Sequence, residues 1–294
     1  MEHWFRPMGL NLRVLTNTSN LASVVQEAYD VFGEGDSGIM ADLHFEFLQR
    51  EQTLAGAHEY HMFPDRAELR IGGELALSAE PKLGRVNGCF SENVINDRSA
   101  FRVHFLYFAL SAMLPARGFL GVHAGCVAVN RTTVLLRGPQ QSGKSVLAYE
   151  AAEQGFPVIA GSTVWIDPAG ATWWGIPRWI YLRHSARTLF PELPATPEVS
   201  FGNERKVEID LGISCPNHGV PGIIVFMDRN PAEAPSLERI SEAHAHALWS
   251  TGVAGNETDA PNYQTRINRL LERPSYRLNF TDDVNVALNL IARC

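Results

Sequence analysis

Hydrophobic and polar residues alternate in the first hundred positions of the chain, most clearly over 43–49 (LHFEFLQ) and 67–73 (AELRIGG). A period of two predicts strands with one buried face, and the Gly, Pro and Asp residues between these runs are typical of turns. We therefore expect antiparallel strands, followed by one buried helix at roughly 100–114. Residues 1–118 are predicted to form a β-rich region that packs on the rest of the chain.

The pattern changes in the second part of the chain. The runs 120–129 (LGVHAGCVAV) and 132–136 (TTVLL) are apolar and contain small and β-branched residues, which favours buried strands. Residues 144–154 are mostly helix formers, and Gly155 is a typical helix stop. The alternation of strand and helix predicts an α/β domain over 119–294.

The segment between the strand 132–136 and the helix reads G-P-Q-Q-S-G-K-S and matches the phosphate-binding pattern G-x-x-x-x-G-K-[ST] at every fixed position. Backbone N–H groups at a helix start form an anion nest, and the helix dipole adds partial positive charge there. Gly138 and Gly143 permit the tight turn, Lys144 is expected to contact the β and γ phosphates, and the Ser145 hydroxyl is expected to bind Mg²⁺. The sequence therefore predicts a nucleoside triphosphate site. The predicted contacts are Gly138, Pro139, Gln140, Gln141, Ser142, Gly143, Lys144, Ser145 and Val146.

Residues 123–167, which surround this motif, resemble the catalytic domain of HPr kinase/phosphorylase and its P-loop relatives. Further similar segments are 173–183 (WWGIPRWIYLR), 204–210 (ERKVEID), 222–229 (GIIVFMDR) and 274–280 (PSYRLNF). The resemblance implies an α/β P-loop fold of the HPr kinase/PEP carboxykinase-like type, in which helices flank a mixed sheet. It also implies an ATP- and Mg²⁺-dependent kinase that phosphorylates a serine or another hydroxyl on a protein or peptide.

The resemblance assigns roles to several residues outside the loop. It implies that His123 lies near the phosphates and that Arg178 or Lys206 neutralises charge in the transition state. Arg and Lys at strand ends are, however, more often solvated surface residues. The family carries two adjacent aspartates after the strand that follows the loop helix, and here these positions are Gly161 and Ser162. Neither residue replaces a carboxylate as a base or as a Mg²⁺ ligand.

Three carboxylates are candidates to replace the missing aspartates. Asp167 lies a few residues downstream, Glu150 is on the predicted loop helix, and Asp228 ends the apolar run 223–227. We favour Asp167 as the catalytic carboxylate, with the alternative that it opens an Asp-Pro-Ala-Gly turn. Asp228 resembles a carboxylate at the end of a buried strand that reaches Mg²⁺ through water, with the alternative of a turn residue paired with Arg229.

Two functions remain open at this stage. The first is an active kinase of the HPr kinase type. The second is a pseudokinase, in which nucleotide binding is structural or regulatory, and the residues Gly161 and Ser162 favour it. A third and weaker possibility is ATP hydrolysis that drives a partner, for which the chain shows no clear water-positioning residue or arginine finger.

Composition and charge restrict the possible binding partners of the protein and its cellular compartment. The chain has 294 residues, 45% of them hydrophobic, and a net charge of −7, so it has no basic field of the kind that collects nucleic acid or anionic lipid. We expect a protein or peptide partner, no nucleic acid and no membrane, and the sequence leaves a homo-oligomer open. The N-terminus lacks the pattern of a secretory signal, and four scattered cysteines without a C-x-x-C pair fit a reducing compartment, so we expect a cytoplasmic protein.

Two histidine pairs and a group of tryptophans are further candidates for functional sites. The pairs His58/His61 and His244/His246 do not have the spacing of known metal sites, and we interpret them as ordinary polar positions, the second pair on a helix suggested by 237–249. Four tryptophans are predicted to be core residues rather than a stacking platform: Trp165, Trp173, Trp174 and Trp179.

Overall fold

The computed structural model describes residues 1–51, 54–193, 197–201, 204–229, 234–252, 257–260, 262–280 and 283–294. It is a mixed α/β structure that divides into two compact units, unit 1 (Met1–Gly118) and unit 2 (Phe119–Cys294). No helix of the described residues is both long and apolar enough to cross a membrane.

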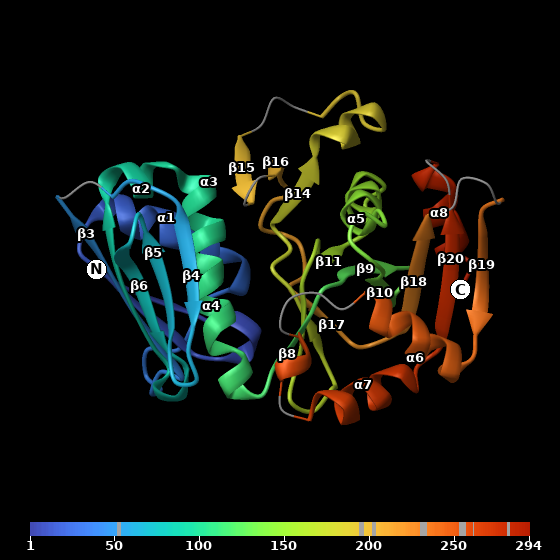
Figure 1. Cartoon of the computed structure of the whole chain (residues 1–294), viewed down its shortest axis with the longest axis horizontal. Helices are drawn as coiled ribbons and strands as arrows, with labels where there is room; N and C mark the ends of the chain where they lie inside the picture. Colours follow the sequence, from blue (N-terminus) through green and yellow to red (C-terminus); the bar gives the residue numbers. More distant parts are fainter. Residues whose placement is uncertain are drawn as a thin grey trace. The chain divides into compact units, whose positions relative to one another are not determined.

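Unit 1 is built on a seven-stranded sheet with the strand order β1-β2-β3-β7-β6-β5-β4 (Figure 1). Its strands are β1 (Glu2–Phe5), β2 (Leu12–Thr16), β3 (Leu43–Arg50), β4 (His58–Met62), β5 (Ala67–Ile71), β6 (Glu74–Glu80) and β7 (Arg85–Ser91). Its helices are α1 (Ser19–Tyr29), α2 (Glu92–Asn96), α3 (Arg98–Phe101) and α4 (Tyr107–Met113), and a π-helical turn (Arg102–Leu106) joins α3 to α4.

Two expectations for unit 1 are corrected by these elements. The strand predicted at 43–49 is present as β3, but it pairs in parallel with both β2 and β7. Only the strand at 67–73 has the expected antiparallel neighbours, β4 and β6. The prediction of a single helix was also wrong, because α1 precedes the one near 100–114. Helix α1 begins after Thr18, whose side chain accepts a hydrogen bond from the Leu21 N–H, an N-cap that the sequence carries.

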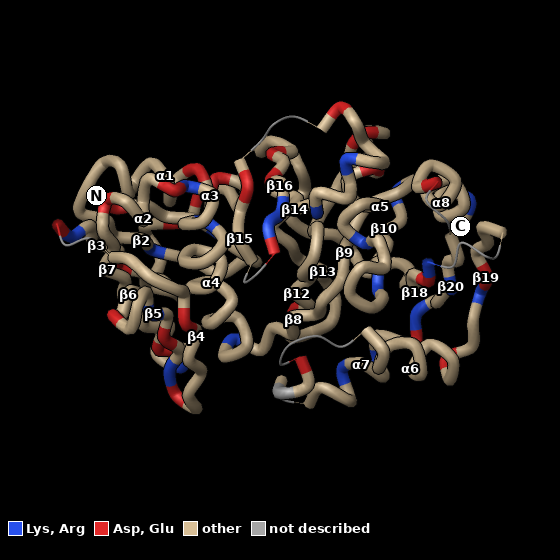
Figure 2. Tube along the Cα trace, turned by 45° about the horizontal axis from the view of Figure 1, so that its top comes forward, with Lys and Arg blue, Asp and Glu red and all other residues tan. Residues whose placement is uncertain are grey.

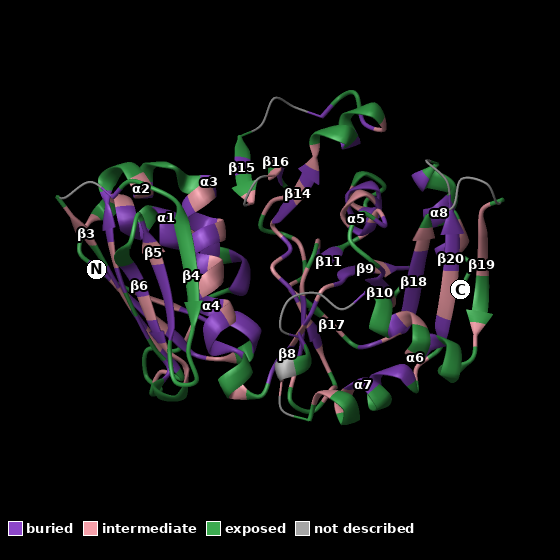
Figure 3. Cartoon of the chain, in the orientation of Figure 1, coloured by how far each residue is buried: buried purple, intermediate pink, exposed green. Residues whose placement is uncertain are grey.

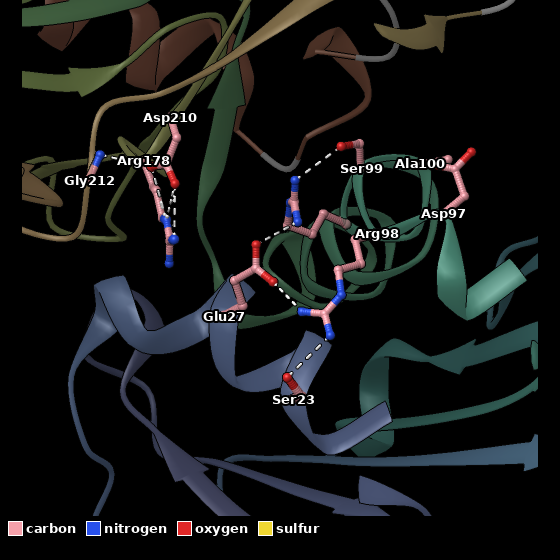
Figure 4. Close-up of polar contacts among 10 residues, drawn as sticks. Ser23, Glu27, Asp97, Arg98, Ser99, Ala100, Arg178, Asp210 and Gly212 are labelled. Carbon is pink, nitrogen blue, oxygen red and sulfur yellow. Dashed lines mark hydrogen bonds and ion pairs between the residues drawn. The ribbon is translucent and has the colours of Figure 1, made fainter. Parts of the chain in front are cut away.

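Buried aromatic rings and one acidic side chain hold the helices of unit 1 together. Phe90 of β7 makes edge contacts with Phe101 and Phe105, at ring centroid distances of 4.8 and 4.9 Å. Glu27 of α1 accepts hydrogen bonds from Arg98 at 2.7 Å and from Arg102 at 2.9 Å (Figure 4). The carboxylate therefore links α1 to the α3–α4 segment.

Unit 2 contains a six-stranded mixed sheet with the order β11-β9-β10-β18-β20-β19. These strands are β9 (Gly125–Val129), β10 (Thr132–Arg137), β11 (Val158–Ala160), β18 (Ile223–Arg229), β19 (Ser236–Ile240) and β20 (Ser275–Phe280). The central strands β10, β18 and β20 are parallel, whereas β9, β11 and β19 pair antiparallel with their neighbours. The carboxyl ends of the three parallel strands therefore meet at one edge of the sheet, where ligands of α/β proteins usually bind.

Helices cover both faces of this sheet (Figures 1 and 3). One hydrophobic core packs under α5 (Lys144–Glu153) and α8 (Val284–Ile291), and the other under α6 (Glu242–Thr251) and α7 (Tyr263–Leu271). Two smaller sheets complete the unit. The first has the order β17-β13-β12-β8, from β8 (Leu120–Val122), β12 (Val164–Ile166), β13 (Trp173–Trp174) and β17 (His218–Gly219), and the second has the order β14-β16-β15, from β14 (Trp179–Arg183), β15 (Glu198–Phe201) and β16 (Glu204–Asp210).

Some elements of unit 2 match the prediction and two differ. The strand at 132–136 and the helix at 144–154 are confirmed as β10 and α5, and Gly155 has the left-handed φ of 78° that ends the helix. The single strand expected at 120–129 is two strands of different sheets, because the chain leaves β8 after Val122 and enters β9 at Gly125. The segment 237–249 is not one helix, since its first residues form the edge strand β19.

Three of the four tryptophans predicted to be core residues are buried: Trp165, Trp173 and Trp179. Trp174 is half-buried and lies against the His218 ring, with centroids 4.6 Å apart. No cluster of three or more His, Cys, Asp or Glu side chains within the described ranges is arranged to hold a metal ion.

Candidate functional site

A glycine loop, Gly138–Gly143, connects the carboxyl end of β10 to the first residue of α5. Gly143 adopts a φ of +91°, and a Cβ atom on it would lie 2.8 Å from the Phe280 ring. A Cβ atom on Gly138 would lie 2.7 Å from the Ser142 Oγ and 2.8 Å from the Met227 carbonyl oxygen. Both positions therefore need glycine, since side chains would collide with the loop itself or with the neighbouring strands.

Lys144 is the buried cation of the glycine loop. Its side chain folds under the loop, where Nζ donates hydrogen bonds to the carbonyl oxygens of Gly138 at 2.9 Å and Pro139 at 2.8 Å. Burial, together with the charges of Arg137 and Lys206, lowers the pKa of Lys144 to about 8, and the charge of Glu257 partly opposes this shift. The ammonium group is thus held against the loop at a helix N-terminus, with its charge only partly compensated.

Arg137, the last residue of β10, forms a fully buried ion pair with Glu257. The guanidinium is 0% exposed and the carboxylate 6%, and two nitrogens of Arg137 each lie 3.0 Å from a different oxygen of Glu257. Arg137 also donates to the carbonyl oxygen of His123 at 3.0 Å and lies 4.2 Å from the Trp249 ring centroid. A bidentate pair of this kind fixes the start of the glycine loop and the position of His123 at once.

His123 occupies the bend between β8 and β9, and both of its backbone polar groups are held by the buried pair. Its N–H donates to the Glu257 carboxylate and its carbonyl accepts from Arg137. Burial, followed by the charges of Lys144, Arg137 and Lys206, lowers the pKa of His123 to about 4. The imidazole is therefore neutral at pH 7, and it lies within electrostatic reach of Lys144.

The end of β11 meets the first turn of α5 beside His123. The Ser145 Oγ donates a hydrogen bond to the Gly161 carbonyl oxygen at 3.2 Å, and a hydrogen bond joins His123 to the backbone of Ser162. The segment 158–166 carries no Asp or Glu. The positions that the family fills with aspartates thus lie directly at the candidate phosphate site, but they supply only backbone oxygens and a hydroxyl.

Asp167 is placed away from His123. It follows β12, and the register of β12 with β8 pairs Ile166 with Leu120 and Val164 with Val122. His123, which follows Val122, therefore lies at the other end of the strand pair. The Asp167 carboxylate accepts the Ala171 N–H at 2.7 Å and opens the turn that the sequence offered as the alternative.

The two basic residues to which the family resemblance assigns catalytic roles have different surroundings in the structure. Arg178 is bound by Asp210 through its Nε and one terminal nitrogen, at 3.0–3.3 Å (Figure 4). Lys206 of β16 lies near the loop, since its charge lowers the pKa values of both Lys144 and His123. Burial lowers the pKa of Lys206 itself, and its nearest acid, Glu204, is 3.9 Å away. Of the two, Lys206 contributes to the charge of the candidate site.

The other carboxylates considered from the sequence have different surroundings. Glu150 is buried on α5 and accepts a hydrogen bond from Gln154 within the same helix. Asp228, at the carboxyl end of β18, lines the same cavity as the glycine loop and pairs with Arg277 at 2.6 Å. Asp228 thus forms a cross-strand pair to β20, and its pairing with Arg229 stays a prediction.

Arg137 and Glu257 were missed by sequence reasoning. Arg137 carried a usable signal, because an arginine that ends an apolar strand directly before a phosphate-binding motif must either be exposed or find a buried anion. Glu257 carried none, since it lies 120 residues from its partner.

Comparisons with known proteins add little to this geometry. No protein-family model matches the chain, and no curated protein sequence matches it. Among solved structures, the structure of the Hpr(Ser) kinase/phosphatase from Coxiella burnetii matches 59% of this chain and 94% of its own, with 12% sequence identity and a TM-score of 0.30. At these values the match assigns neither a family nor an activity to the chain.

Proposed function

We propose that unit 2 binds ATP with Mg²⁺ and that the phosphates lie in the segment Gly138–Ser145. The observation that carries the proposal is Lys144, a buried ammonium group at a helix N-terminus that donates hydrogen bonds to two loop carbonyls. A phosphate is the ligand that this arrangement favours, since it accepts hydrogen bonds from backbone N–H groups and from an ammonium group together.

The residues present fit a triphosphate. Gly138 and Gly143 let the loop close tightly, because a Cβ atom at either position would collide with Ser142, Met227 or Phe280. The Ser142 Oγ is buried without a hydrogen-bond partner among the described residues, as expected of a donor aimed at an absent anion. The Ser145 hydroxyl, at the second position of α5, donates a hydrogen bond of 3.2 Å to the Gly161 carbonyl oxygen, and it is the group we assign to Mg²⁺.

The proposed activity is phosphorylation of a hydroxyl on a protein or peptide. Bound ATP would supply the phosphoryl group, and this chain would contribute charge and position through Lys144 and Lys206, with neutral His123 beside them. This assignment rests on the sequence resemblance together with the grouping of these three residues.

A pseudokinase is the second candidate, and one observation favours it specifically. The end of β11 lies against Ser145 and His123 without a carboxylate, so neither a base nor a direct acidic Mg²⁺ ligand comes from that strand. In that case ATP binding would serve to stabilise unit 2 or to regulate a protein partner.

The nucleotide site is tested by calorimetric titration of the protein with ATP, with and without Mg²⁺. The variant Lys144→Met removes the charge and keeps most of the side-chain length, so we expect ATP affinity to fall at least roughly tenfold. The matched control is Lys82→Met, at an exposed position of unit 1. Unchanged ATP affinity in the Lys144 variant contradicts the site.

Transfer of radiolabel from ATP to proteins of a cell extract separates the two functions, because only the kinase transfers it. The double variant Gly161→Asp, Ser162→Asp sharpens the result. A Cβ atom at position 161 would lie 3.4 Å from Ile180, an ordinary contact, so the substitution is accommodated there. We expect it to increase phosphotransfer or ATP hydrolysis by restoring a base and a metal ligand. An inactive double variant that still binds Mg-ATP counts against the placement of the site relative to β11.

A further inference from the structure

A cavity of about 350 Å³ borders the glycine loop, a volume within the usual range of small-ligand sites. One wall is the first part of the loop, and the others come from the end of β18, from α6 and from β20. Among the lining residues of these last three elements are Asp228, Arg229, Leu248, Thr251 and Arg277.

The charges of this cavity differ from those around Lys144. Among the described lining residues Asp228 is the one carboxylate, and Arg277 holds it at 2.6 Å while the side chains of Asp228 and Arg277 stay partly exposed, at 46% and 36%. A second arginine, Arg229, also lines the cavity. Figure 2 shows the mixture of acidic and basic residues along this part of the trace, near β18 and β20. The cavity therefore combines charged groups of both signs with the apolar side chains of Phe226, Met227 and Leu248, a lining that suits a polar organic group such as a nucleoside.

The order of the strands places the β18 wall of this cavity and the end of β11 on opposite sides of β10. Strand β18 lies next to β10 on one side, whereas β9 and then β11 lie on the other. Ser145, His123 and Ser162 meet at the β11 side. A triphosphate whose reacting end lies at that side must direct its organic end across the loop toward β18.

We propose that this cavity binds the nucleoside part of the triphosphate, an inference that rests on the proposed function. The Asp228 carboxylate accepts hydrogen bonds from ribose hydroxyls, the role that acidic residues at strand ends have in other nucleotide sites. The planar guanidinium of Arg277 and the side chain of Leu248 provide surfaces for the base. Thr251, at the exposed end of α6, forms the rim.

The variant Thr251→Trp tests the proposal by filling the cavity without touching Lys144. Calorimetric titrations use Mg-ATP and inorganic tripolyphosphate, which has the phosphates of ATP and no nucleoside. We expect the variant to bind ATP at least about tenfold more weakly and tripolyphosphate within about twofold of the unaltered protein. The control is Ser250→Trp, which adds the same indole at an exposed neighbouring position outside the cavity lining and should leave both affinities unchanged.

A second variant, Asp228→Ala, guards against an indirect effect of the large indole. It should reduce the difference between the ATP and tripolyphosphate affinities, because the ribose loses its acceptor. Equal loss of both ligands in Thr251→Trp, or unchanged ATP binding in both variants, overturns the proposal. Loss of phosphotransfer with unchanged ATP binding also overturns it and assigns the cavity to the phosphate acceptor.

Failure of the proposed function has a different signature. If the unaltered protein binds neither ATP nor tripolyphosphate, both the phosphate site and the nucleoside site are wrong. If it binds both ligands equally and Lys144→Met abolishes both, the phosphate site stands and the nucleoside cavity is wrong.

Discussion

Two arginine–carboxylate pairs lie at the carboxyl edge of the parallel strands of unit 2, and they differ mainly in burial. The pair between Arg137 and Glu257 is almost without solvent exposure, at 0% and 6%. The pair between Arg277 and Asp228 is 36% and 46% exposed and lines a cavity. The first holds backbone groups of His123 as well, whereas the second joins two neighbouring strands.

This difference in burial indicates that the two arginine–carboxylate pairs have different roles. A buried pair that loses one partner leaves an uncompensated charge in a medium of low dielectric, so it can hardly exchange its contacts for a ligand. An exposed pair contributes little to stability and can open to a ligand at small cost. We therefore interpret Arg137 and Glu257 as the frame of the site, and Arg277 and Asp228 as groups available to a ligand.

The largest expected effect comes from breaking the frame. Glu257→Gln keeps the shape of the side chain and removes its charge, so Arg137 becomes a buried cation without a counter-ion. We expect the free energy of unfolding of unit 2 to fall by about 3–5 kcal/mol, measured by urea denaturation followed by tryptophan fluorescence. The double variant Arg137→Met, Glu257→Leu should recover much of that loss, because no charge remains buried. A loss below about 1 kcal/mol in Glu257→Gln would remove the distinction between the two pairs.

Sequence patterns predict only part of the structure around Arg137 and Glu257. The loop, β10 and α5 could be predicted, because local signals specify them: fixed glycines, β-branched residues and a glycine stop at 155. The partner of Arg137 could not, since it follows from tertiary folding across 120 residues. The same limit explains why 120–129 was expected as one strand. Apolar periodicity continues through His123 and does not show that the two halves join different sheets.

The site residues show a similar division. The family resemblance favoured Asp167 over Asp228, but the structure places Asp167 at the far end of β12 from His123, while strand order brings Asp228 to the loop. The preference between them depended on which strands are neighbours, and a single sequence does not specify that. The expected ATP, Mg²⁺, peptide partner and packing of residues 1–118 on the rest of the chain stay predictions.

The next largest effect is a loss of stability at acid pH that we assign to His123, whose backbone groups are held by Arg137 and Glu257. Its pKa is about 4 in the folded protein against the ordinary 6.5. The unfolded chain therefore binds more protons between these values, and the free energy of unfolding falls as the pH drops from 6.5 toward 4. In His123→Gln this loss should be smaller by about 2 kcal/mol between pH 7 and pH 5. Denaturation curves at both pH values measure it, with His244→Gln, at an exposed position of α6, as the control. If the free energy of unfolding falls by the same amount between pH 7 and pH 5 in the unaltered protein and in His123→Gln, the imidazole of His123 is not buried in its neutral form.

A smaller effect is expected at alkaline pH, where Lys144 titrates. Its pKa of about 8 means that ammonium predominates at pH 7, and this is the form that binds phosphate. Above pH 8 the ligand must bring a proton with it, so ATP affinity should weaken by up to about tenfold per pH unit. Titrations at pH 7 and pH 9 in two buffers of different ionisation enthalpy measure both the affinity and the proton uptake. In Lys144→Met the residual affinity should not follow this pH dependence, and an equal dependence in that variant would place the titrating group elsewhere.

The smallest effect on stability is expected at the exposed pair of Asp228 and Arg277. Asp228→Asn removes the charge that faces Arg277, at a position where water screens both partners, so the free energy of unfolding should change by no more than about 1 kcal/mol. Urea denaturation under the conditions used for Glu257→Gln measures it. The same carboxylate-to-amide change at the two pairs thus isolates burial as the variable. A loss at Asp228 as large as that at Glu257 would show that the cavity-side pair is also structural, and Asp228 would then be a poor candidate to release Arg277 for a ligand.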